Sequence, residues 1–174
     1  MSTVQNSSEE QQQAHLNNDA NSSQYLTFIL GGEEYGINIL SVQEIKGWMP
    51  ATPIPNLPEH ILGVMNLRGT VVPILDLRIR FEFDKVEYGP MTVVIVVKVH
   101  GAEKERTVGV VVDAVSEVYN VNQNAVENAP DMGNTINTEF IRGLASVGEK
   151  MVILLNIDEL LDTEISENLS GALQ

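Results

Sequence analysis

The segment from Gly63 to Phe81 constrains the fold more than any other part of the chain, because it reads as two strands joined by a tight turn. Its sequence is GVMNLRGTVVPILDLRIRF. Apolar and β-branched residues such as Val71 and Val72 suit a pleated, half-buried surface. Gly69 lies between two apolar runs, where a glycine provides a positive φ at no steric cost. The segment therefore predicts a strand-turn-strand unit.

The second strand of this segment contains a proline and is followed by a residue that can cap a helix. Pro73 has no backbone N–H, so its strand is expected at a sheet edge or with a bulge there. Asp76 precedes a predicted short helical turn over 77–81, which its side chain can cap. From spacing alone, Arg68 and Asp76 are a turn charge and an N-cap, and no catalytic group lies between the strands.

The rest of the folded part reads mainly as short strands. Residues 91–99, MTVVIVVKV, are so continuously β-branched that both faces of this strand are expected to be buried. The other expected strands cover residues 24–30, 34–39, 107–112, 140–147 and 150–156. About ten short strands with little helix predict an all-β fold of barrels rather than a parallel sheet with crossovers.

Few segments favour helix or loop. Residues 40–47, LSVQEIKG, are too short for periodicity to separate helix from strand, and extended structure is favoured. A short helix is expected to begin at Pro58 or Glu59 and end before Gly63, with His60 on its surface. A second short helix is expected over 157–162, and the Asn-rich residues 120–139 indicate a long loop.

The ends of the chain differ in composition from its centre. Residues 1–23 are rich in Ser, Gln, Asn and Glu and predict a disordered polar tail. Residues 24–165 form the expected folded unit, and residues 166–174 a flexible C-terminus. No internal sequence repeat is evident.

Composition excludes several classes of protein. The formal net charge of −14 and the pI near 4.4 would repel a phosphate backbone, so nucleic acid is not an expected partner. No apolar run approaches the roughly 20 residues that a membrane helix needs, and the polar N-terminus has no hydrophobic signal segment, so the protein is expected in the cytoplasm. The absence of cysteine excludes disulfides and thiolate chemistry.

The titratable residues do not form a catalytic or metal-binding pattern. His15, His60 and His100 have no carboxylate or second histidine at ligand spacing. Asp113 follows the run GVVV and is better explained as a turn or interface residue than as a catalytic acid. We therefore expect no catalytic residues, no metal, no cofactor and no enzymatic activity.

Over residues 24–162 the chain resembles the CheW coupling proteins of bacterial chemotaxis. The matching blocks, in order, are QYLTFILGGEEYGINILSVQEIKG, NLRGTVVPILDLRIRF, TVVIVVKV, TVGVVVDAVSEV and MVILLNIDELL. The resemblance implies two packed, intertwined five-stranded SH3-like barrels. In this arrangement the first and last parts of the chain share one barrel, and the middle builds the other.

The resemblance also implies a function without chemistry. CheW-like proteins couple the cytoplasmic tips of methyl-accepting chemoreceptors to the histidine kinase CheA, so that receptor state controls kinase autophosphorylation. The regulatory domain of the kinase has the same fold, which lets like surfaces pair and build arrays. The expected protein is a monomer in solution that is recruited to membrane receptor clusters without inserting into the membrane. The alternatives are an SH3-like scaffold for another partner outside chemotaxis, or a small-ligand sensor.

The kinase-facing surface implied by the resemblance falls on VQEIKG. Val42 and Glu44 are its main candidates, with Ile45 and Lys46 beside them. Strand alternation leaves only one of Val42 and Ile45 facing outward, so Val42 as a core residue remains open.

The receptor side implied by the resemblance contains Arg68 of the NLRG motif, whose planar charged group suits a carbonyl or carboxylate partner. The helical receptor tip is expected in an apolar groove between the barrels. The candidates for lining that groove are Val94, Val96, Val110 and Val112, with burial in the core as the alternative.

Overall fold

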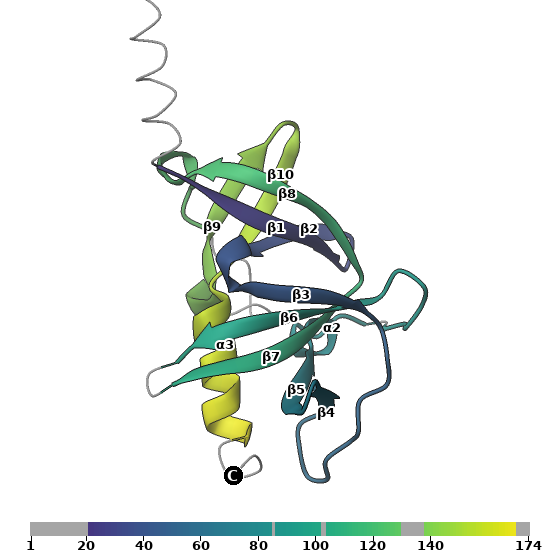
Figure 1. Cartoon of the computed structure of the whole chain (residues 1–174). Helices are drawn as coiled ribbons and strands as arrows, with labels where there is room; N and C mark the ends of the chain where they lie inside the picture. Colours follow the sequence, from purple (N-terminus) through teal and green to yellow (C-terminus); the bar gives the residue numbers. More distant parts are fainter. Residues whose placement is uncertain (1–20, 85, 102–103, 130–137, 170–174) are drawn as a thin grey trace, which may run out of the picture.

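Two five-stranded sheets make up the molecule, one above the other in Figure 1. The structure is a computed structural model that describes residues 21–84, 86–101, 104–129 and 138–169. The first sheet contains β1 (Ser22–Leu30), β2 (Glu33–Asn38), β8 (Ala114–Asn122), β9 (Ile141–Val147) and β10 (Lys150–Leu155). The second contains β3 (Val42–Gly47), β4 (Ile61–Leu67), β5 (Thr70–Asp76), β6 (Val93–His100) and β7 (Glu105–Val112). The predicted all-β class is confirmed.

The helical elements are short and connect or cover the sheets. The α-helices are α2 (Leu77–Arg80) and α3 (Ile157–Glu164), and the remaining turns are η1 (Ile39–Ser41), η2 (Gln123–Ala125), η3 (Thr138–Phe140) and the π-helical η4 (Ile165–Leu169). No helix in the described part of the chain is long and apolar enough to cross a membrane.

Both sheets have the same strand arrangement. The orders are β8-β1-β2-β10-β9 and β3-β6-β7-β5-β4, and the pairing between the third and fourth strands is parallel in each. In each sheet an isolated bridge joins the segment after the first strand of this order to the last strand. Glu127, after β8, pairs with Leu144 of β9, and Thr52, after β3, pairs with Val64 of β4. These bridges close the first sheet into barrel 1 and the second into barrel 2.

The common arrangement comes from a structural repeat. Each half of the chain runs through a hairpin, a strand, a second hairpin and a helix, over β1 to α2 and over β6 to α3. The halves exchange their first hairpins, because β1 and β2 join the strands of the second half while β6 and β7 join those of the first. The strand registers give these equivalent positions: Thr27 and Val96, Glu34 and Thr107, Gly63 and Gly143, Arg68 and Gly148, Thr70 and Lys150, and Asp76 and Asn156.

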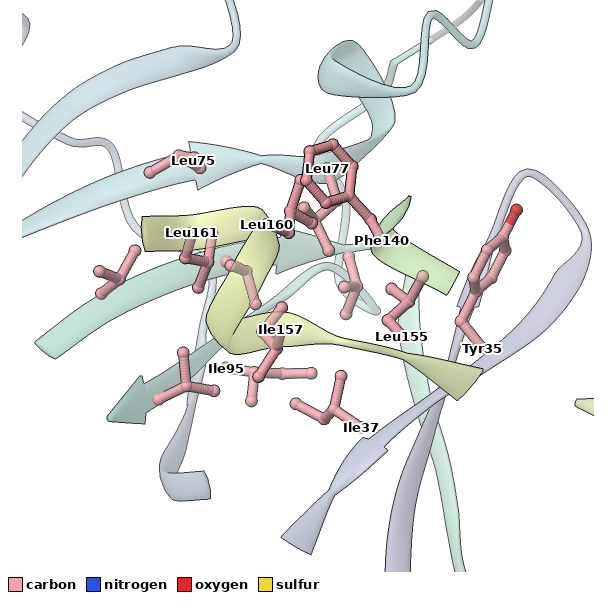
Figure 2. Close-up of a cluster of buried hydrophobic side chains, with 14 of the residues drawn as sticks. Tyr35, Ile37, Leu75, Leu77, Ile95, Phe140, Leu155, Ile157, Leu160 and Leu161 are labelled. Atoms are coloured by element: carbon pink, nitrogen blue, oxygen red, sulfur yellow. The ribbon is translucent and has the colours of Figure 1, made fainter. Parts of the chain in front are cut away.

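Three apolar clusters form the core. One lies inside each barrel, and the largest contains residues from both sheets and from α3. Figure 2 shows Ile37 of β2, Ile95 of β6 and Leu160 of α3 together in this shared cluster. Helix α3 follows β10 of barrel 1 but packs against β6 of barrel 2, which fastens the two barrels together (Figure 1).

Several local predictions agree with the structure. The Asp76 side chain caps α2 by accepting a hydrogen bond from the Arg78 backbone N–H at 3.0 Å. Strand β6 is buried on both faces, because Val94 and Val96 pack inside barrel 2 while Ile95 packs in the shared cluster.

The helix predicted after Pro58 is wrong. Residues 59–60 form a turn and β4 begins at Ile61. Gly63 is not a helix end: it lies in the strand with φ +135°, and an added Cβ would lie 1.9 Å from the backbone oxygen of Thr52. The glycine is needed there for the close approach that closes barrel 2.

The other corrections concern strand edges and chain ends. The prediction that Pro73 lies at a sheet edge or at a bulge is wrong, because β5 lies inside its sheet and the register shift of this hairpin falls on β4 between Ile61 and Gly63. The pairing of β5 with β7 begins only at Ile74. Residues 120–122 belong to β8 rather than to a loop. Strand β1 begins at Ser22, and η4 continues to Leu169, which is buried. The predicted tail over 1–20 and the last residues, 170–174, lie outside the described residues.

Candidate functional site

Strand β3 carries the predicted kinase-facing residues, and because a bulge between Val42 and Glu44 interrupts its alternation, their exposure shows which of them offer surface. Val42 is half-buried and packs against the shared core cluster, whereas the Ile45 side chain is 45% exposed. Glu44 and Lys46 are half-buried on the same strand. Ile45, not Val42, is therefore the residue that offers apolar surface.

Arg68 lies in the two-residue turn between β4 and β5. Arg68 and Gly69 have φ values of +52° and +86°, the pattern of a type I′ hairpin. The guanidinium donates from Nη2 to Glu44 Oε2 at 2.9 Å, and 85% of the Arg68 side chain is exposed. The structure thus brings together two residues whose predicted roles belong to different partner surfaces.

This ion pair crosses the open end of barrel 2, which we call the barrel 2 mouth. A hollow of about 340 Å³ opens there, with Val72 and Val96 on its lining. The other lining residues are Gln43, Glu44, Leu67, Arg68, Thr70 and Thr107. The lining combines methyl groups, hydroxyl groups and one ion pair, which suits the binding of a protein side chain better than catalysis.

The four valines predicted to line a receptor groove are buried, although Val96 also lines the barrel 2 mouth. Val94 and Val96 pack inside barrel 2, and Val110 and Val112 pack in the cluster shared by both barrels. All four are at most 1% exposed. The prediction that these residues line a receptor groove is therefore wrong. They belong to strands that are buried on both faces, so the alternative, burial in the core, is correct.

Exposed apolar side chains do occur along β3 and near its ends. Leu40 is 88% exposed, and Met49 and Met91 are more than half exposed. The Trp48 backbone N–H donates to the Thr92 carbonyl at 3.1 Å and so extends the pairing of β3 with β6. We call Leu40, Ile45, Met49 and Met91 the β3 apolar strip. Leu40, Met49 and Met91 are not predictable as surface residues from the sequence, because nothing in their spacing separates surface from core.

Arg78 forms a buried network that the sequence did not reveal. Its Nε and Nη2 atoms donate to the Asp76 carboxylate at 2.9 and 2.8 Å, and Nη1 donates to Asp113 Oδ1 at 3.0 Å. Burial lowers the pKa of Arg78, but hydrogen bonds to Asp76 and Asp113 outweigh burial and raise it. Asp113 also accepts from the Gly31 N–H at 2.9 Å, which favours the structural reading of this residue.

A second charged cluster holds the C-terminal helix. Glu164 Oε2 lies 2.6 Å from His60 Nε2, and Arg80 donates to the other carboxylate oxygen. Burial raises the pKa of Glu164, but the hydrogen bonds from His60 and Arg80 outweigh it and lower that pKa. Among the described residues, no group of three or more His, Asp or Glu could hold a metal ion.

Comparison with known proteins gives one consistent result. The CheW-like domain matches residues 24–164. The "Chemotaxis protein CheW" of Klebsiella aerogenes is 47% identical over 141 residues, covering 81% of this chain and 82% of that protein. The protein of the same name from Rhizobium meliloti is 37% identical, covering 88% and 95%.

A solved structure agrees with these relatives. The scaffolding protein TtCheW from Thermoanaerobacter tengcongensis superposes with a TM-score of 0.71 at 35% identity, covering 79% of this chain and 86% of that chain. The two-barrel fold, its strand order and these matches together show that the chain belongs to the CheW family of chemotaxis proteins.

Proposed function

We propose that the protein is a non-catalytic adaptor that couples methyl-accepting chemoreceptors to a CheA-type histidine kinase. Family membership supports the adaptor role, and the ion pair between Glu44 and Arg68 is the observation that carries the coupling. A change at either residue alters the surroundings of the other, because their charged atoms are 2.9 Å apart. Receptor state would thereby influence kinase autophosphorylation without any chemical step in this protein.

The proposed kinase surface is β3. Ile45 provides the exposed apolar contact, and Glu44 with Lys46 provides charges that orient the regulatory domain of the kinase. Val42 supports the strand from the core side. An interface of this kind gains affinity from the apolar residue and specificity from the charges.

The proposed receptor surface consists of Leu40, Met49 and Met91 of the β3 apolar strip together with Arg68. A receptor tip made of helices can place an apolar face against Leu40, Met49 and Met91. Methionine side chains adapt to different partners, which suits an adaptor that serves several receptors. Arg68 is exposed enough to exchange Glu44 for a carbonyl or carboxylate on the receptor.

The proposed setting is the cytoplasmic face of receptor clusters. The protein would be a monomer in solution and would enter arrays by pairing with the like-folded kinase domain. Its net charge of −14 opposes both self-association and binding to nucleic acid.

The Glu44→Lys substitution tests the proposed kinase surface. We expect binding to the kinase regulatory domain, measured by calorimetry, to weaken about tenfold or more, because a like charge replaces an attractive one at the interface. The matched control is Glu149→Lys, which makes the same charge change in the exposed turn after β9. Normal binding by a folded Glu44→Lys protein, or equal weakening by the control, would contradict the proposal.

A further inference from the structure

A second hollow lies away from the ion pair, beside α2 and the segment that follows it. Its volume is about 600 Å³, within the usual range for a binding pocket. Half-buried apolar side chains form much of its lining, namely Leu62, Ile79, Phe83 and Val86. Three exposed carboxylates, those of Glu59, Glu82 and Asp84, complete the lining with Tyr88. We call this site the α2 hollow.

The aromatic walls of the α2 hollow are held in place. Tyr88 stacks on Trp48 with ring centroids 4.3 Å apart, and its hydroxyl donates to Asp76 Oδ2 at 2.8 Å. Arg78 lies over the same ring, 4.8 Å from its centroid. Phe83 lies so close to Gly31 that a Cβ there would be 2.9 Å from its ring. A preformed wall loses little conformational entropy when a ligand binds.

The carboxylates around the hollow have no ionic partner among the described residues. In the described part of the chain, no ion pair includes Glu59, Glu82 or Asp84. Carboxylates beside an apolar, low-dielectric surface attract a cation more strongly than they would in open water. The matching ligand is therefore an apolar group flanked by positive charge.

This chain does not contain a good candidate for that ligand. Residues 1–20 include Glu9, Glu10 and Asp19 but neither Lys nor Arg. A second copy of the chain carries a net charge of −14 and would be repelled. The positively charged ligand is therefore expected to belong to a different protein.

We propose that the α2 hollow binds a basic segment of a partner protein, in which one aliphatic or aromatic side chain enters the hollow between Phe83 and Tyr88. Lysine or arginine residues on either side of this anchor would pair with Glu59, Glu82 and Asp84. This interaction is separate from the proposed receptor and kinase surfaces, since it uses neither β3 nor Arg68.

Trp48 provides a direct reporter for the test. It is the only tryptophan in the chain and stacks on Tyr88, which lines the hollow. The probes are three capped peptides, RRLRR, RRARR and EELEE, titrated against the full-length protein at low salt, with calorimetry as a second readout. We expect RRLRR to bind about tenfold more tightly than RRARR, because leucine buries more apolar surface than alanine. EELEE should not bind.

A charge-neutral variant locates the site. The double substitution Glu59→Gln and Asp84→Asn changes two exposed side chains and should leave stability unchanged. It should weaken RRLRR binding about fivefold or more, while the control Glu149→Gln should leave binding unchanged. The proposal is overturned if RRLRR and RRARR bind equally, if the double variant binds normally, or if the control weakens binding as much. None of these outcomes bears on the proposed receptor and kinase contacts.

Discussion

The open end of barrel 1 is filled by its own side chains, whereas the equivalent end of barrel 2 is hollow. In barrel 1 the Thr27 hydroxyl donates to Glu34 Oε1 at 2.8 Å, and Lys150 Nζ lies 3.8 Å from Glu34 Oε2. Glu34 is only 8% exposed. A long buried side chain with two partners thus fills the space at this end of barrel 1.

Two of the three equivalent positions in barrel 2 carry smaller side chains, and the third keeps a side chain of the same shape. Val96, Thr107 and Thr70 stand where barrel 1 has Thr27, Glu34 and Lys150, and they line the barrel 2 mouth. The loss of side-chain volume leaves room for a partner. One barrel of a repeated design therefore holds a buried glutamate with two partners at this end, while the other has a polar opening spanned by an ion pair.

The turns at these ends differ in the same way. Arg68 holds a φ of +52° at the position where barrel 1 has Gly148 with φ +60°. A side chain in this left-handed conformation costs about 1 kcal/mol or more relative to glycine. Barrel 2 accepts this strain and gains an exposed guanidinium, which is the pattern expected when a position serves binding rather than stability.

Substitutions of the glycines at the closing bridges, Gly63 and Gly143, should give the largest differences in unfolding free energy between the two barrels. Gly63→Ala should cost about 4 kcal/mol of unfolding free energy, because the new Cβ meets the Thr52 backbone oxygen and the φ is +135°. Gly143→Ala should cost less, about 2 kcal/mol, because its φ is not positive and its Cβ would lie 2.7 Å from a backbone oxygen, that of Glu127, and 2.4 Å from the Val126 side chain. Urea denaturation measures both values. Equal costs, or a smaller cost for Gly63→Ala, would contradict the comparison.

The residues that cap α2 and α3 should give the next largest difference in stability. Asp76 caps α2 while paired with buried Arg78, whereas Asn156, which follows β10 of barrel 1, caps α3. Arg78→Met should cost about 3 kcal/mol, because it leaves the Asp76 charge buried without its partner. Adding Asp76→Asn should recover most of that loss, since an asparagine caps the equivalent helix. The two variants are compared by thermal and urea denaturation, and a double variant no more stable than the single one would argue against this explanation.

The hairpin turns provide the smallest effect on stability. Arg68→Gly should raise the unfolding free energy by about 0.5 kcal/mol, because relief of the positive φ exceeds the value of an exposed ion pair. Gly148→Arg should lower it by about 1 kcal/mol. Chemical denaturation at matched ionic strength gives both numbers. If Arg68→Gly instead destabilised the protein by more than about 1 kcal/mol, the ion pair would matter more for folding than for binding.

The sequence was informative where local chemistry decides the structure. The β-branched run of β6 and the cap at Asp76 follow from neighbouring residues alone. The pairing of Glu44 with Arg68 depends on two strands that meet only when barrel 2 closes, and that of His60 with Glu164 depends on where α3 docks. Neither pairing has a signal in local spacing.

Two predictions are wrong because local spacing does not show which parts of the chain pack together. Gly63 is not a helix end, since its role is to let two backbones approach. The four valines predicted for a groove lie on strands that are buried on both faces. The structural repeat was also hidden, because few equivalent positions keep the same residue and the exchanged hairpins separate the halves of each barrel.

The most direct test of the adaptor proposal is autophosphorylation of a CheA-type kinase with receptor-containing membranes, with and without this protein. We expect strong activation by the protein, loss of activation with Glu44→Lys, and impaired receptor control with folded Arg68→Gly. Activation that is absent with matched partners, or that is unchanged in both variants, would contradict coupling through the barrel 2 mouth.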